Sequence, residues 1–447
     1  MVPPPAHRHR SEPRTGVGAR PALILVGRAW FGGRLQPIEI AIGEDGRILS
    51  IGKDRSGAPR HDVGEAVILP AATDLHVHFR DPGGPTDAES FVSGTAAAAL
   101  GGVGLVGEMP NTRPPVVDRD ALDEKAQRVR GRAAIDVLLY ASPTVARERA
   151  ALARTAGGFK LYLSPTTGIA DPPPLAAVPG LLAELADLGL PVAVHAEDPR
   201  DFLTTGRPAD PASWNAARPV RAELDAVATL ATAPEWLRLH VAHVTSPVAA
   251  ERLLREGRSF EATPHHLLLS ERSGADAKFK VNPPLRTEAE RSALWEAFRR
   301  GRVPIVASDH APHPITEKAL PFHQAPSGVP GVETMLPLLL ERVRAGVLEL
   351  PVLLAAACDR PARWVGQPIG RIAPGHRAHL LVVDFRTRSR IEGRRLHSAC
   401  GWTPFEGWDG IFPREHYRDG ERIVEDGEFV GAPSGRVVRP EYAPTPR

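Results

Sequence analysis

The chain has 447 residues, and its 42% hydrophobic and 24% charged content excludes a fibrous or wholly disordered protein. The length predicts one large domain with a smaller one. Acidic and basic residues nearly cancel to a formal net charge of +2, so global charge does not favour nucleic acid or membrane binding. Cys358 and Cys400 are too few for a disulfide framework, and no apolar run reaches the roughly 18 residues of a membrane span. We expect a cytoplasmic globular protein.

Lysine is scarce among the basic residues. Only six of the 55 are lysines, at positions 53, 125, 160, 278, 280 and 318. A bias in genomic base composition explains such a shortage. It also makes each lysine that is present worth examining.

The two ends of the chain share one kind of pattern. Residues 1–20 are rich in proline and arginine and predict a disordered leader. Residues 21–70 hold short aliphatic runs between turn clusters, which is typical of antiparallel strands, and similar runs return in 366–447. We expect one small β-sandwich domain built from both ends, with a larger domain, residues 71–365, inserted between them.

The middle of the chain alternates apolar strands with helical segments rich in alanine and leucine. Eight candidate strands occur, at 67–79, 102–109, 134–141, 158–163, 191–196, 237–244, 258–264 and 303–309. Eight strand–helix units predict an α/β fold of the (β/α)₈ TIM-like barrel type, in which catalytic residues lie at the C-terminal strand ends. A doubly wound open sheet is the alternative, but no glycine-rich dinucleotide motif follows the first strand.

Histidine and aspartate side chains fall at the ends of these strands. His76 and His78 are two residues apart on one strand, so both imidazoles share a face and can share a metal ion. His195, His243 and Asp309 each end a different strand. Because a barrel brings its strand ends together, this distribution predicts a metal site.

Lys160 ends the fourth barrel strand. One interpretation is a structural salt bridge. The other is a carbamate formed at Nζ with CO₂, which converts the amine into a bridging carboxylate. Arginine cannot supply such a ligand because its guanidinium stays protonated, so a lysine in this arginine-rich chain favours the carbamate.

The motifs as a set resemble those of the amidohydrolase superfamily, and within its cyclic amidases those of class I dihydroorotases. They are DLHVHFRDPG (74–83), GEMPNTRPP (107–115), FKLYL (159–163), VHAE (194–197), AHV (242–244), TPHHLLLS (263–270), KVNPPLR (280–286), SDHAPH (308–313), PGVETMLPLLL (330–340) and WTPFEG (402–407). The Lys160 segment is more similar to the dihydroorotase domain of the animal multifunctional pyrimidine protein than to the many bacterial enzymes with an aspartate bridge.

The resemblance implies two divalent metal ions, with zinc expected. One would be held by His76, His78, carboxylated Lys160 and Asp309, and the other by Lys160, His195 and His243. Asp309 would also be the catalytic acid and base. The implied reaction, part of pyrimidine biosynthesis, is the reversible cyclisation of N-carbamoyl-L-aspartate to (S)-dihydroorotate and water.

The resemblance also implies substrate contacts. The side chains are Arg80, Asn111, Asn282 and His313, with Thr166 and Thr167 either in a mobile lid or in an ordinary polar loop. Arg80 follows His78 by two residues and can hold a substrate carboxylate with a bidentate fork. The alternative for Arg80 is a surface ion pair with Asp81 or Asp87.

Four other histidines are assigned supporting roles, and several functions compete with the one implied above. His265 and His266 are expected to be structural, or to support the ligands, rather than to be ligands themselves. His240 is expected to pack in the barrel wall, and His310 to orient Asp309 or its loop.

The competing functions are an allantoinase, a dihydropyrimidinase or hydantoinase, and a non-catalytic scaffold for aspartate transcarbamoylase. The sequence leaves open whether the chain forms a homo-oligomer and whether it has an aspartate transcarbamoylase partner.

Overall fold

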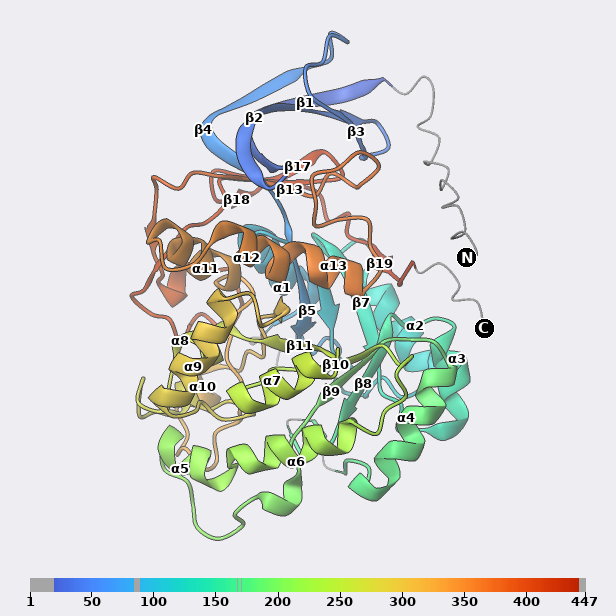
Figure 1. Cartoon of the computed structure of the whole chain (residues 1–447), viewed down its shortest axis with the longest axis vertical. Coiled ribbons are helices and arrows are strands. Elements are labelled where there is room, and N and C mark those ends of the chain that lie inside the picture. The colour runs from blue at the N-terminus through green and yellow to red at the C-terminus, as the bar shows by residue number, and fades with distance from the viewer. Residues whose placement is uncertain (1–19, 84–88, 167, 170, 442–447) are drawn as a thin grey trace, which may run out of the picture.

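The computed structural model describes residues 20–83, 89–166, 168–169 and 171–441 (Figure 1). Its largest feature is a parallel sheet of eight strands that follow one another in chain order around a barrel. The strands are β5 (Ala72–Val77), β6 (Val103–Glu108), β7 (Asp136–Ala141), β8 (Gly158–Tyr162), β9 (Val192–His195), β10 (Leu239–Val241), β11 (Ser259–Ala262) and β12 (Ile305–Val306). The predicted barrel is confirmed.

Burial on both faces explains why these segments form parallel strands. Every residue of β6 and β7 is buried, and strands covered on both sides read as continuous apolar runs. Gly107 allows a close approach within the wall, because a Cβ there would lie 2.6 Å from the Leu75 carbonyl oxygen.

The barrel closes beside the candidate metal ligands. An isolated parallel bridge joins Val77 of the first strand, β5, to His310 in the segment that follows the last strand, β12. The His78 amide donates to the His310 carbonyl oxygen at 2.7 Å. The closure therefore brings the segment that carries His78 next to the one that carries Asp309.

Helices lie around the outside of the barrel (Figure 1). They are α1 (Phe91–Leu100), α2 (Arg119–Val129), α3 (Arg149–Ala153), α4 (Val178–Asp187), α5 (Pro211–Ala217), α6 (Val220–Leu230), α7 (Pro247–Arg255), α8 (Pro264–Leu268), α9 (Glu288–Arg299), α10 (Ile315–Lys318), α11 (Met335–Arg344), α12 (Leu350–Leu354) and α13 (Arg360–Trp364). Capping boxes at Ser90 and Thr287 begin α1 and α9. Within the described ranges, no helix has the length and apolar character needed to cross a membrane.

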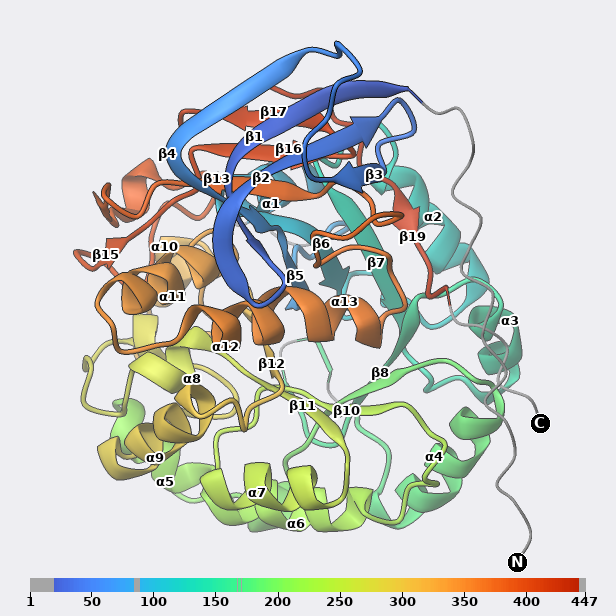
Figure 2. The same cartoon turned by 45° about the horizontal axis from the view of Figure 1, so that its top comes forward.

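Both chain ends build the second sheet, as expected from the sequence. Its strands are β1 (Pro21–Phe31), β2 (Arg34–Gly43), β3 (Ile48–Ile51), β4 (Arg60–Pro70), β13 (Leu380–Val383), β16 (Glu415–Arg418), β17 (Glu421–Glu425) and β18 (Glu428–Phe429). The two ends meet where β4 pairs antiparallel with β13. Figure 2 shows this sheet above the barrel, with α12 and α13 passing in front of the barrel strands.

The C-terminal part of the chain also returns to the barrel. Strand β19 (Val437–Val438) pairs in parallel with β7, and β14 (Ser389–Arg390) pairs with β15 (Asp409–Gly410). Buried Asp136 accepts from Arg377 Nη1 at 2.6 Å and from Arg418 Nη2 at 2.8 Å, which ties the end of the barrel to the second sheet. The domain boundaries expected from the sequence stay predictions.

Candidate metal centre

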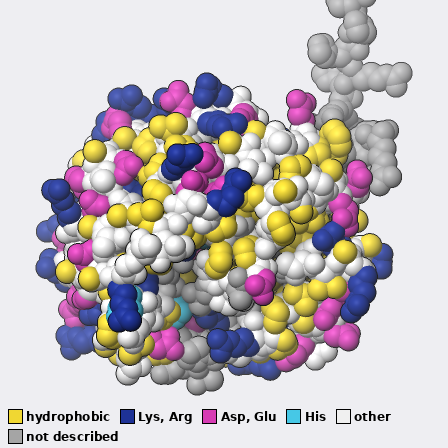
Figure 3. Space-filling model, turned by 90° about the horizontal axis from the view of Figure 1, so that it is seen from below, with side chains coloured by type: hydrophobic (Ala, Val, Ile, Leu, Met, Phe, Trp, Pro, Cys, Tyr) yellow, Lys and Arg dark blue, Asp and Glu magenta, His cyan; other side chains and the backbone are white. Residues whose placement is uncertain are grey.

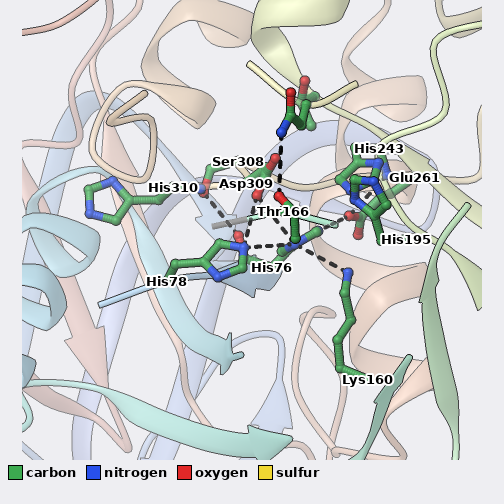
Figure 4. Close-up of polar contacts among 12 residues, drawn as sticks. His76, His78, Lys160, Thr166, His195, His243, Glu261, Ser308, Asp309 and His310 are labelled. Atoms are coloured by element: carbon green, nitrogen blue, oxygen red, sulfur yellow. Dashed lines mark hydrogen bonds and ion pairs between the residues drawn. The ribbon is translucent and has the colours of Figure 1, made fainter. Parts of the chain in front are cut away.

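The six candidate metal ligands come together at the C-terminal ends of the barrel strands (Figure 4). They are His76 on β5, Lys160 on β8, His195 on β9, and His78, His243 and Asp309 just after β5, β10 and β12. All six side chains are buried. From below, Figure 3 shows histidine side chains in a hollow of the surface, on a face where acidic and basic groups are mixed.

His76, His78 and Asp309 form the tightest group. Asp309 Oδ1 lies 3.2 Å from Nε2 of each histidine, and the two Nε2 atoms are 3.2 Å apart. One ligand atom from each residue lies within 4.8 Å of the others. This distance suits a single ion.

Hydrogen bonds on the far side of each ring set the tautomers. His76 Nδ1 lies 2.5 Å from Glu261 Oε1, and His78 Nδ1 lies 2.7 Å from Asn111 Oδ1. Because both oxygens are acceptors, each Nδ1 carries the proton and each Nε2 presents a lone pair. Two lone pairs that face each other cannot form a hydrogen bond, and a divalent cation between them satisfies both. The residues therefore fit a metal ion.

His195 and His243 form a second group. His195 Nδ1 lies 2.9 Å from His243 Nε2, and the His243 and His76 ring centroids are 5.3 Å apart. His195 Nε2 donates to Glu197 at 2.8 Å, which leaves Nδ1 as a lone-pair donor. His243 Nδ1 is buried without a hydrogen-bond partner among the described residues. This pair can provide ligands for a second ion.

The charge of Lys160 acts on the histidines of both groups. Its Nζ is 3.4 Å from His76 Nε2, and its positive charge helps to lower the pKa of His76, His78, His195 and His243, for which burial is the larger cause. Burial lowers the pKa of Lys160 itself to about 8. Within the described part of the chain, Lys160 forms no ion pair, so the structure offers no support for the salt-bridge interpretation.

Three residues of this site have strained backbones. Arg80, His243 and Asp309 have φ values of 57°, 38° and 47°. Residues other than glycine rarely adopt this left-handed region of the backbone. Holding a residue there costs on the order of 1 kcal/mol. The surrounding structure holds that strain in place, which is common where side chains must be aimed at a reacting centre.

Two acidic residues hold the histidines, and the sequence analysis predicted no role for either of them. Glu261 of β11 joins His76 to His240, whose Nε2 lies 2.9 Å from Glu261 Oε2. Glu197 holds His195 and accepts from Arg218 Nε at 3.2 Å. Burial would raise the pKa of Glu261, but the charges and hydrogen bonds of the two histidines outweigh it and lower the pKa. A glutamate inside a buried apolar strand was the signal that could have revealed Glu261.

The proposed substrate contacts lie mostly in one pocket, which five of the candidate metal ligands also line. Its lining comprises His76, His78, Arg80, Asn111, Tyr162, Thr166, His195, His243, Val281, Asn282, Asp309, Ala311, Ser327 and Gly328. Arg80 is buried, and its Nε has no hydrogen-bond partner in the described ranges. Asp81 pairs instead with Arg128, at 3.2 Å, and Asp87, the other acid considered as a partner, lies outside the described residues. Arg80 is therefore available to a ligand.

The other predicted substrate contacts are His313 and the two threonines Thr166 and Thr167. His313 is not part of the pocket lining, and its ring nitrogens lie 3.1 Å from Glu317 Oε2 and 3.1 Å from the Ser327 carbonyl oxygen. Thr166 accepts from Asn282 Nδ2 at 3.4 Å. Thr167 lies outside the described residues.

Two other histidines, His266 and His310, support loops beside the site. His266 bonds to Thr263 Oγ1 at 2.8 Å and to the Pro283 carbonyl oxygen at 3.0 Å. His310 Nε2 lies 3.1 Å from Glu89, and its Nδ1 accepts from the Gly331 amide at 3.0 Å.

Replacing Glu261 by glutamine tests how the His76 tautomer is set. We expect metal affinity to fall about 10- to 100-fold, because an amide cannot accept from both His76 and His240 as strongly as a carboxylate. Titration of the metal-free variant with Zn²⁺ measures this change. The exposed Glu235→Gln is the control, and an unchanged affinity in Glu261→Gln would contradict the assignment.

Comparison with known proteins agrees with this geometry. Residues 67–409 match the model of the amidohydrolase family. The chain is 34% identical to a dihydroorotase of Thermoplasma acidophilum, over 93% of this chain and 97% of that protein. It is 39% identical to a dihydroorotase of Halobacterium salinarum, over 83% and 89%.

Solved structures give the same fold. The L-hydantoinase (dihydropyrimidinase) of Arthrobacter aurescens superposes with a TM-score of 0.86 at 27% identity, covering 94% of this chain and 100% of that one. Family match, sequence relatives and strand-end ligands agree, and the chain therefore belongs to the amidohydrolase family, where it groups with the dihydroorotases.

Proposed function

We propose that the protein is a dihydroorotase that interconverts N-carbamoyl-L-aspartate and (S)-dihydroorotate plus water. The observation that carries this proposal is buried Arg80, which lines the same pocket as five of the candidate metal ligands and whose Nε has no hydrogen-bond partner among the described residues. A guanidinium placed there can hold a carboxylate that is not attacked. Dihydroorotases at 34% and 39% identity support the same substrate.

Two divalent ions, with zinc expected, are part of the proposal. His76, His78, Lys160 and Asp309 would hold one, and Lys160, His195 and His243 the other. When bound, such ions make hydroxide available near neutral pH and polarise the carbonyl that is attacked. The lone pairs of His76 and His78 that face each other are the strongest support for this ligand set.

Lys160 would take part as a carbamate. Its neutral amine attacks CO₂, an N–C bond forms and one proton leaves, so the product carries a carboxylate. Burial lowers the pKa of Lys160 to about 8, which provides a neutral fraction at physiological pH. The negative charge would replace an ammonium that repels cations with a ligand that binds them.

Asp309 would move the proton. In ring opening its carboxylate accepts a proton from the attacking water and returns it to the departing amide nitrogen. In ring closure it takes the proton from the ureido nitrogen. Burial raises the pKa of Asp309, which makes the carboxylate a better proton acceptor than an exposed aspartate.

The substrate would be oriented by side chains on separate loops. Arg80 and Asn111 would bind the free carboxylate, and Asn282 would line the ring. His313 would contribute if it exchanges the Ser327 carbonyl for substrate, and the Thr166 loop would cover the pocket.

A second candidate is a hydantoinase or dihydropyrimidinase, favoured by the TM-score of 0.86 with such an enzyme. The test is a parallel assay with dihydroorotate, hydantoin and allantoin, together with metal analysis. We expect about two ions per chain and turnover of dihydroorotate. Turnover of hydantoin or allantoin alone would overturn the substrate assignment, and a metal-free, inactive protein would favour the scaffold alternative. A homo-oligomer, an aspartate transcarbamoylase partner and a cytoplasmic location remain further proposals.

Arg80→Met is expected to raise KM for dihydroorotate about 10- to 100-fold, because it removes a charge-assisted hydrogen bond to the carboxylate. Steady-state kinetics on metal-loaded enzyme measures the change, with the exposed Arg255→Met as control. If KM stays at the wild-type value, Arg80 does not bind the carboxylate.

A further inference from the structure

Most of the few lysines are buried. Lys125 and Lys160 are fully buried, Lys280 is 5% exposed and Lys318 is 3% exposed. Lys125 has an acidic partner, since its Nζ lies 3.0 Å from Glu108 Oε1. Lys280 and Lys318 form no ion pair with any described residue. Two buried cations without carboxylate partners are costly, so their presence needs a reason.

Backbone carbonyl groups take the place of carboxylates around both ammonium groups. Lys280 Nζ donates to the carbonyl oxygens of Phe322 at 2.8 Å and Ala325 at 2.7 Å. Lys318 Nζ donates to those of Gly328 at 2.9 Å, Pro326 at 3.0 Å and Lys280 at 3.3 Å. These bonds tie residues 322–328 to each other and to the backbone at 280. We call this arrangement the lysine clamp.

Aromatic rings complete the surroundings of the clamp. Lys280 Nζ lies 4.7 Å from the centroid of Trp214 and 5.3 Å from that of Phe322. Lys318 Nζ lies 5.6 Å from the centroid of Trp402. Ring faces stabilise a cation by their negative quadrupole, so both charges are held without an acidic side chain.

The clamp holds one wall of the substrate pocket. Val281 and Asn282 directly follow Lys280, and Ser327 and Gly328 lie in the clamped segment; all four line the pocket. The Gly328 amide donates to the Lys280 carbonyl oxygen at 2.9 Å, which joins the two halves of the wall.

Other contacts leave this wall little freedom. A Cβ at position 328 would lie 2.5 Å from the Ala311 carbonyl oxygen. Trp214 Nε1 donates to the Val281 carbonyl oxygen at 3.0 Å and to Asn282 Oδ1 at 3.2 Å. Trp214, whose ring packs against the Lys280 ammonium group, therefore also orients the wall.

Geometry explains why lysine stands here in an arginine-rich chain. An ammonium group is compact and has three N–H donors, which matches the three carbonyl oxygens around Lys318 Nζ. A planar guanidinium is larger and spreads its donors in a fork. Arginine could not make the same three bonds without moving the wall.

The positive charge of the clamp affects a residue beside the pocket. Burial, Arg80 and Lys318, in that order, lower the pKa of His313 to about 2, so its ring is neutral. Burial also lowers the pKa of Lys280 to about 8, with Arg218 adding to the effect. Burial, with Lys280 adding to the effect, lowers the pKa of Lys318 to about 7, and in its protonated form Lys318 adds positive charge beside a pocket that we propose takes an anion.

We propose that Lys280 and Lys318 are positioning residues that hold the wall formed by 281–282 and 327–328 in the conformation that receives the anionic substrate. This inference rests on the proposed function. It assigns no contact between either lysine and the substrate, because their donors are directed at the protein backbone.

The test compares Lys280→Met and Lys318→Met with wild type and with the exposed control Lys53→Met. We expect KM for dihydroorotate to rise about tenfold in both variants, with kcat changed less than about threefold, because the wall orients substrate and the metal ligands stay in place. Metal content should stay at the wild-type value. A lower Tm with unchanged KM would overturn the proposal, since it shows that the clamp only stabilises the fold.

Trp214→Phe provides a second test if the methionine variants do not fold. It keeps a ring over Lys280 but removes the donor to Val281 and Asn282, so KM should rise without loss of metal. An unchanged KM would overturn the proposal. If wild type hydrolyses hydantoin and not dihydroorotate, the proposed function fails and the substrate is not an anion; KM for hydantoin in the same variants then shows whether the clamp positions the wall for a neutral ring.

Discussion

Lys160→Arg is expected to lower kcat for dihydroorotate about a thousandfold or more and to leave at most one metal ion per chain. Arginine keeps a positive charge at a buried position and cannot form a carbamate. Loss of the bridging carboxylate removes metal-ion stabilisation of the transition state worth several kcal/mol, and about 4 kcal/mol corresponds to a thousandfold in rate.

Metal analysis and kinetics measure both effects, and ¹³C NMR of wild-type enzyme prepared with ¹³C-bicarbonate detects the carbamate carbon directly. The exposed Lys53→Arg is the matched control and should behave like wild type. Circular dichroism separates a loss of metal from a loss of fold. A fully active Lys160→Arg enzyme with two ions would show that this position supplies no ligand.

Asp309→Asn is expected to lower kcat about 10²- to 10⁴-fold in both directions of the reaction. The amide is nearly the same size as the carboxylate but cannot accept the proton from water or from the ureido nitrogen. Oδ1 also lies 3.2 Å from Nε2 of His76 and of His78, so the change weakens the ligand set at the same time.

Metal titration separates these two roles of Asp309. If activity stays low at saturating Zn²⁺, proton transfer has been lost; full recovery of kcat with added metal would show that Asp309 is a ligand and not the acid and base. Asp187→Asn, at an exposed position, controls for the change of charge.

The sequence was sufficient to predict the barrel, and it placed the candidate ligand residues at the strand ends where the structure brings them together; their role as ligands stays a prediction. Each strand is a short, largely buried run of mainly apolar residues, and this pattern is local. His76, Lys160 and His195 lie within or end such runs, so a barrel of parallel strands brings them together without further information. The same reasoning could not place His313, because its loop turns the ring toward Glu317 and Ser327.

The groups that support the ligands could not be predicted in this way. Glu261 is 185 residues from His76 in the chain, yet their side chains are 2.5 Å apart. The partner of a buried carboxylate depends on which strands become neighbours and on the exact angle between them. Sequence spacing describes neither.

The sequence by itself therefore determined which segments form strands and which residues stand at their ends, because a strand's burial pattern is set within a few residues. Only the tertiary structure decided the tautomers of His76 and His78, the open Nε of Arg80, and the use of Lys280 and Lys318 to hold the pocket wall. These features arise from groups far apart in the chain that meet only when the barrel closes and its loops pack. Lysine is scarce in this chain, and at Lys318 the ammonium group is surrounded by backbone carbonyl oxygens that belong to segments separated in the sequence.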